Sequence, residues 1–250
     1  MNYHQPGDYR TKGAVTVSAT SVMDYFPFLQ KQLAVIYQSG QKLRPWLLWE
    51  LHNPWSRSAF SVDSWKFLDL CQSSELLQLI TPFIGENIIL FDSQFSPDLY
   101  DTGKSEISWK SDRLRCPVNP LHGLVVRIPF SDLINENVKF IYKADLSGEQ
   151  VIEVKFGQLI CHNINLAYRI QGIENLTQPV EYVIRYFPAT SRYLRDPSTK
   201  LHHELTERYP LLNYAQMPLW LVQGEDKANN DFVTGFQPKA GRWIGTENPV

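Results

Sequence analysis

The sequence has few cysteines, no long apolar segment and no excess of one charge. Its three cysteines, Cys71, Cys116 and Cys161, are too few and too scattered for a disulfide framework or a cysteine-rich zinc site. The apolar runs are far shorter than the ~20 residues that span a bilayer, and the N-terminal stretch has no apolar segment of signal-peptide length. With 24 basic and 26 acidic residues, the formal net charge is −2. We therefore expect a cytoplasmic protein that binds neither nucleic acid nor membrane.

The length of the chain and its pattern of β-rich segments fit one β-rich domain. Its 250 residues suit a single unit over 1–250, with a helical brace over about 20–84 and a packed C-terminal tail. Residues 62–84 carry apolar positions at helical spacing and are expected to form two helices broken near the middle. Over about 86–190, seven or eight runs rich in β-branched and aromatic residues alternate with Gly, Pro, Asn and Asp turns. This pattern predicts an antiparallel barrel or jelly roll.

Short catalytic motifs are also missing. The sequence has no glycine-rich phosphate loop, no G-x-S-x-G, no H-E-x-x-H and no C-x-x-C. Six histidines could supply metal ligands, but no two of them have the spacing that places them on one face beside a carboxylate. His162 falls in the middle of an expected strand, where a hydrogen-bonded core histidine is the simpler interpretation. No local metal site is predicted.

The order of the β-rich segments carries a resemblance to a known family. ITPFIGENIILFDSQF, then ISWKSDRLRCPVNPLHGLVVRIPFSDLINENVKFIYKAD, then VIEVKFGQLICHNINLAYRI, then PVEYVIRYFPA resembles the phytanoyl-CoA dioxygenase family. The N-terminal DYRTKGAVTVSATSV is similar to the family's opening strand and helix, so the resemblance covers roughly residues 8–195. It implies a mainly β fold with flanking helices, a double-stranded β-helix (cupin-like jelly roll). It also implies non-haem Fe(II) and 2-oxoglutarate chemistry in the mouth of that barrel.

The family's W-H-x-D signature supplies two ligands of a 2-His-1-carboxylate iron site. The matching stretch here is Trp109-Lys110-Ser111-Asp112, so the aspartate is kept and Lys110 replaces the histidine. The family's second histidine corresponds to Tyr168, or to Ala167 if the register is shifted by one residue. Two of the three ligands implied by the resemblance are therefore replaced.

The family's arginine, which binds the distal carboxylate of 2-oxoglutarate, also departs from the pattern. Its place falls near Val180, and Arg185, the nearest arginine, lies further along the strand. An ammonium such as that of Lys110 repels Fe(II) and cannot ligate it until deprotonated. We therefore expect no metal and no cofactor, with Fe(II) and 2-oxoglutarate as the alternative.

Lys110 and Asp112 are two residues apart on an expected strand, so their side chains should share one face. If that face lines the barrel, the Lys110 ammonium replaces the metal beside the carboxylate, with the Tyr168 hydroxyl as a third member. This assigns Lys110, Asp112 and Tyr168 as candidate catalytic residues. In the alternative, Lys110 points to solvent and Asp112 caps a turn. Arg127, in GLVVRIPF, is a candidate cofactor-binding residue if it points inward and an ordinary surface arginine if it points outward.

Three functions are compatible with these residues. The first is a pocket that kept the fold and binds a small molecule, or a non-catalytic partner of an active relative. The second is a metal-free enzyme for cyclisation, isomerisation or elimination, with Lys110 as a base or a Schiff-base amine and a tyrosine as acid. The third is an active Fe(II)/2-oxoglutarate dioxygenase with atypical ligands, such as His162 if the strand register differs from the one assumed. The tryptophans Trp46, Trp49, Trp55 and Trp65 would suit an apolar ligand, although core packing explains most of them, and the sequence does not indicate an oligomeric state.

Overall fold

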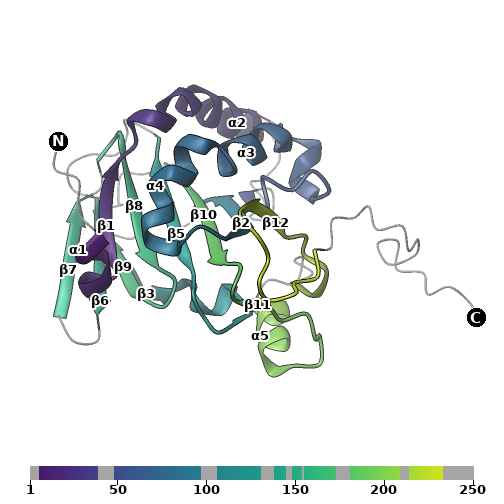
Figure 1. The fold of residues 1–250 in the computed structure, drawn as a ribbon. Helices are drawn as coiled ribbons and strands as arrows, with labels where there is room; N and C mark the ends of the chain where they lie inside the picture. Colours follow the sequence, from purple (N-terminus) through teal and green to yellow (C-terminus); the bar gives the residue numbers. More distant parts are fainter. Residues whose placement is uncertain are drawn as a thin grey trace, which may run out of the picture.

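The computed structural model describes residues 6–38, 48–96, 106–130, 138–144, 148–153, 155–172, 181–208 and 214–232. Within these residues, most strands form two antiparallel sheets that lie face to face (Figure 1). The larger sheet has the order β1 (Ala14–Ser18), β8 (Gln158–Asn163), β5 (Leu124–Pro129), β10 (Glu181–Pro188), β2 (Ile88–Phe95) and β12 (Trp220–Gln223).

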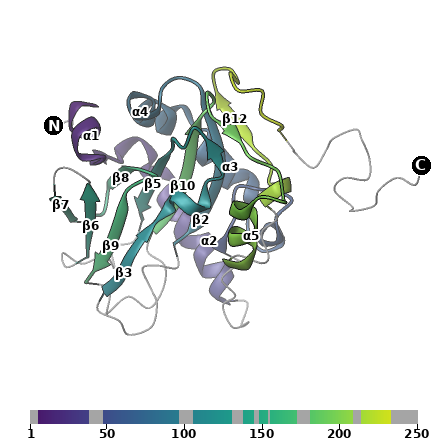
Figure 2. The ribbon, with the colours of Figure 1, turned by 90° about the horizontal axis from the view of Figure 1, so that it is seen from below.

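The smaller sheet has the order β3 (Glu106–Ser111), β9 (Ala167–Gln171), β6 (Lys139–Ala144) and β7 (Gly148–Glu153), seen side by side in Figure 2. From β2 to β10 the chain crosses repeatedly between the two sheets, so neighbouring strands are mostly distant in sequence. This order is that of a double-stranded β-helix, and the predicted jelly roll is confirmed.

Period-two alternation decides which side chains enter the space between the sheets. In β10, Tyr182, Ile184 and Tyr186 pack into the core on the helix side of the larger sheet. Glu181 and Arg185 lie on the opposite face and are fully buried between the sheets. The barrel interior therefore receives charged groups from a strand that is otherwise apolar and aromatic.

Helices cover the outer face of the larger sheet (Figure 1). They are α2 (Phe26–Gln38), α3 (Ser64–Cys71) and α4 (Ser74–Ile84). In chain order, α1 (Pro6–Lys12) and the 3-10 turn η1 (Thr20–Tyr25) come before α2, and the 3-10 turn η3 (Arg57–Phe60) lies between α2 and α3. The predicted break within 62–84 is confirmed, because the Ser73 hydroxyl accepts a hydrogen bond from Leu76 N and so caps the start of α4.

The C-terminal part of the described chain closes one end of the structure. It contains β11 (Arg192–Tyr193), which pairs with β4 (Val118–Asn119), then α5 (Lys200–Arg208) and η6 (Tyr214–Gln216), and β12 extends the larger sheet beside β2. In the described residues no helix is long and apolar enough to cross a membrane. A single domain over the whole chain stays a prediction.

Candidate functional site

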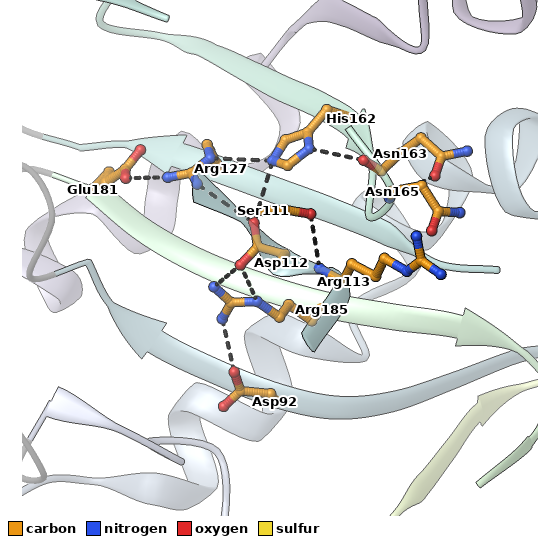
Figure 3. A network of polar contacts seen from close by, with 10 residues as sticks. All are labelled: Asp92, Ser111, Asp112, Arg113, Arg127, His162, Asn163, Asn165, Glu181 and Arg185. Carbon is orange, nitrogen blue, oxygen red and sulfur yellow. Dashed lines mark hydrogen bonds and ion pairs between the residues drawn. The ribbon is translucent and has the colours of Figure 1, made fainter. Parts of the chain in front are cut away.

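Asp112 lies where β3 ends and turns into the 3-10 helix η5 (Asp112–Arg115). The Ser111 hydroxyl accepts a hydrogen bond from Arg113 N and caps this turn. The turn carries the Asp112 carboxylate into the space between the sheets, toward Arg185 (Figure 3). Its side chain is 2% exposed. Asp112 is therefore a buried charge that needs buried partners.

Arg185 is the main partner of Asp112. Its Nε and Nη2 donate to Asp112 Oδ1 at 3.0 and 2.6 Å, and its Nη1 donates to Asp92 Oδ2 at 2.7 Å. Figure 3 shows the guanidinium between the two carboxylates. One arginine on β10 thus joins a carboxylate of the larger sheet to the turn that follows β3.

Arg127 is the second buried arginine, on the neighbouring strand β5. Its Nη1 donates to Glu181 Oε1 at 2.5 Å, and its Nε donates to His162 Nε2 at 3.3 Å. Its Nη2 lies 3.7 Å from Asp112 Oδ2, and His162 Nε2 lies 3.9 Å from the same oxygen. Because Nε2 of His162 accepts from Arg127, the ring proton lies on Nδ1, which donates to the Asn163 carbonyl at 3.2 Å.

Opposing charges fix the ionisation of this network. Burial alone would raise the pKa of Asp112, but Arg185 and Arg127, followed by His162 and Arg115, lower it far below its usual range. Burial and then Arg127 lower the pKa of His162 to about 3. Near pH 7, Asp112 is therefore an anion and His162 is neutral.

Aromatic rings surround the Arg127 guanidinium. Its central carbon lies 4.6 Å from the centre of the Phe140 ring and 4.5 Å from that of Tyr168. The Tyr142 ring packs against His162 at 5.0 Å between centroids, and burial raises the pKa of Tyr142 above its usual value. These rings belong to the smaller sheet, so the network has a charged side and an aromatic side.

The structure brings three of the four predicted site residues together in the barrel. Asp112, Tyr168 and Arg127 come together in the barrel, and Arg127 points inward. Lys110 faces Tyr168 in the β3–β9 register, but its side chain is exposed. The counter-ion of Asp112 is Arg185 rather than the predicted Lys110, because the two guanidinium groups already occupy the space beside the carboxylate. A catalytic role for Lys110, Asp112 and Tyr168 stays a prediction.

Arg185 and Glu181 were not among the predicted site residues. In the sequence, Arg185 lies too far along the strand to match the family's arginine. The signal that identifies it is alternation: Glu181 and Arg185 are four residues apart in an apolar strand, so both must share one face. Two charges on one face of a buried strand require partners, and Asp92, Asp112 and Arg127 are those partners.

Trp55 and Trp65, two of the tryptophans that would suit an apolar ligand, are not part of this network. Trp65 on α3 is 59% exposed and contacts Trp55 edge to face. The Trp55 ring stacks on Trp220 of β12 at 5.6 Å between centroids. Trp46 lies outside the described residues. Binding of an apolar ligand by these rings stays a prediction.

Comparisons with known proteins agree with the strand order. No protein-family model matches the chain, and no curated protein matches it. Among solved structures, a non-heme monooxygenase, the ThoJ–Ni complex, is 14% identical with a TM-score of 0.60, covering 89% of this chain and 85% of that one. CytC3 with Fe(II) and alpha-ketoglutarate is 14% identical with a TM-score of 0.62, covering 93% of both chains. The chain has the fold of the non-haem Fe(II)/2-oxoglutarate oxygenases.

A third neighbour is the epimerase SnoN in complex with Fe3+, alpha-ketoglutarate and nogalamycin RO, 14% identical with a TM-score of 0.52, covering 75% of this chain and 84% of that one. Our expectation of no cofactor is contradicted by these structures, because solved proteins of this fold contain iron and 2-oxoglutarate (alpha-ketoglutarate). The family resemblance is confirmed as a resemblance of fold, while a degenerate iron site stays a prediction.

The described residues, as they are arranged, do not fit a 2-His-1-carboxylate iron centre. Among them, no group of three His, Cys, Asp or Glu side chains could hold a metal ion. Asp112 and His162 offer one carboxylate and one imidazole, but Arg127 lies against both and Arg185 binds Asp112. A metal ion at Asp112 would meet two positive charges, so no chemical step is assigned to iron here.

Proposed function

We propose that this chain binds a small organic molecule in its barrel, beside Asp112 and Arg127. The observation that carries the proposal is a pair of buried atoms, Asp112 Oδ2 and Arg127 Nη2, 3.7 Å apart. Neither atom has a hydrogen-bond partner within the part of the chain that the structure describes. Leaving a buried polar atom unsatisfied costs about 1–3 kcal/mol, so a ligand that satisfies both atoms gains affinity.

The chemistry of the two atoms limits the ligand. Asp112 Oδ2 can only accept a hydrogen bond and Arg127 Nη2 can only donate one. A hydroxyl or a primary amide offers a donor and an acceptor together and suits both. The rings of Tyr142 and Tyr168 beside His162 suit an apolar body attached to that group.

Binding is favoured over proton transfer at these residues. An efficient general acid or base has a pKa near the working pH. The pKa of Asp112 lies far below that range, that of His162 is about 3, and that of Tyr142 is raised by burial. Asp112, His162 and Tyr142 therefore keep their protonation states near pH 7 and can orient a ligand without exchanging protons with it.

An Fe(II)/2-oxoglutarate oxygenase is the second candidate, favoured by the cofactors named with CytC3 and SnoN. The two candidates predict different measurements. An oxygenase converts 2-oxoglutarate to succinate when Fe(II) is supplied, whereas a binding protein does not. Succinate formation that depends on this chain and on Fe(II) would replace our proposal with the second candidate.

Binding is tested by thermal unfolding against a library of hydroxylated and amide-containing small molecules. A ligand at about 100 times its Kd should stabilise the protein by about 2.7 kcal/mol, or about 5–11 °C in Tm. The shift should be lost in Asp112→Asn and Arg127→Met. It should persist in Arg192→Met, a matched change at an exposed arginine. Equal shifts in all variants, or no shift with any compound, would contradict the proposal.

A further inference from the structure

The Arg185 guanidinium forms a bridge between two buried carboxylates. Its three nitrogens all donate, two to Asp112 Oδ1 and one to Asp92 Oδ2, at 2.6–3.0 Å. Arg185 is 1% exposed, and Asp112 and Asp92 are 2% and 4% exposed. The three residues come from β10, from the turn after β3 and from β2, so the bridge joins the two sheets (Figure 3).

The carboxylates need this positive charge. Two buried anions repel each other and lose their hydration, and only a cation with good hydrogen-bond geometry offsets both effects. Arg127 is already paired with Glu181, and Lys110 is exposed. Among the described residues, Arg185 is the cation that contacts both Asp112 and Asp92.

We propose that the Arg185 guanidinium is a built-in cation that holds Asp112 and Asp92 together and competes for Asp112 with any divalent metal ion. A metal ion on Asp112 would have to displace the two N–H groups on Oδ1 or approach Oδ2 beside Arg127 Nη2. Both routes bring two cations together at low dielectric. Removing Arg185 leaves two carboxylates facing one space, which is a donor set for divalent cations.

Calorimetric titration with Ni²⁺ alone tests this competition. We expect Arg185→Ala to bind one Ni²⁺ at least about tenfold more tightly than the unmodified chain. The gain should vanish in Arg185→Ala/Asp112→Asn, and Arg192→Ala should behave as the unmodified chain. Equal affinity in the unmodified chain and in Arg185→Ala would overturn the proposal, and so would a gain that survives Asp112→Asn.

A second measurement guards against a folding defect. Arg185→Ala should unfold at a lower temperature, and guanidinium chloride at low millimolar concentration should restore part of the lost Tm, whereas equal sodium chloride should not. If Arg185→Ala does not fold, Arg185→Gln is titrated instead. It removes the charge but keeps a hydrogen-bond donor, so its Ni²⁺ affinity should still exceed that of the unmodified chain. Absence of any increase overturns the proposal. Neither result depends on whether a small molecule binds beside Arg127.

Discussion

Replacing Arg127 by methionine should destabilise the protein strongly, because Glu181 would keep a buried charge without its guanidinium. Glu181 is fully buried, and its Oε1 lies 2.5 Å from Arg127 Nη1. Removing one partner of a buried ion pair costs about 3–5 kcal/mol. Loss of the cation–π contacts with Phe140 and Tyr168 adds about 1 kcal/mol. The total of about 4–6 kcal/mol corresponds to a fall in Tm of about 8–24 °C for a chain of this size.

Urea denaturation followed by tryptophan fluorescence measures this loss, and a double mutant separates its origin. Arg127→Met/Glu181→Met removes both charges and should recover at least about 2 kcal/mol relative to Arg127→Met alone. The control is Arg169→Met. This residue pairs with the exposed Glu149 at 3.3 Å and lies 5.3 Å from the centre of the Trp109 ring, so its loss should cost at most about 2 kcal/mol. A loss below about 1 kcal/mol in Arg127→Met, or no recovery in the double mutant, would refute the reasoning.

Three further predictions concern pH and the C-terminal segment. The pKa of His162 is lowered to about 3 in the folded protein. As the pH drops below about 6.5, His162 is protonated in the unfolded chain but not in the folded one, so the stability of the protein falls. Between pH 6.5 and 5, the unmodified chain should lose about 2 kcal/mol more than His162→Gln in urea denaturation, and equal losses would contradict this. Burial, followed by the nearby Asp92, raises the pKa of Glu50 to about 7. The stability that Glu50 contributes is therefore full below about pH 4.5 and is lost as the pH rises through 7. Glu50→Gln should therefore gain stability relative to the unmodified chain at pH 8 but not at pH 5, and a loss at both values would count against it. Arg195 donates to carbonyls of three residues within 214–232, so Arg195→Ala should speed limited proteolysis there, and unchanged cleavage would argue that this segment is held by other contacts.

Much of the fold could be predicted because it depends on patterns that are local and repeated. Residues 64–71 and 74–84 show helical spacing with a capping serine between them, and both became helices. The strands after residue 86 are short, β-branched and aromatic, and separated by turn residues. Their division into two sheets is not local information. The strand pattern predicts an antiparallel barrel or a jelly roll, the family resemblance narrows this to a double-stranded β-helix, and the structure confirms that fold.

The site was harder to predict, because side-chain direction depends on how strands end. Asp112 and Lys110 were expected to share one face of a strand. The ladder is irregular between Ile107 and Lys110, and Asp112 already begins the 3-10 turn. The alternation of side chains along a strand therefore does not predict the direction of the Asp112 side chain. Arg185 could have been found by alternation with Glu181, but its partner Asp92 comes from a strand 93 residues away.

A crystal structure of the protein grown with Ni²⁺ and 2-oxoglutarate would test most directly whether guanidinium groups hold Asp112. We expect both Arg185 contacts to Asp112 Oδ1 to remain, with Arg127 still between Glu181 and His162. A metal ion bound to the Asp112 carboxylate, with Arg185 turned away from it, would contradict this arrangement.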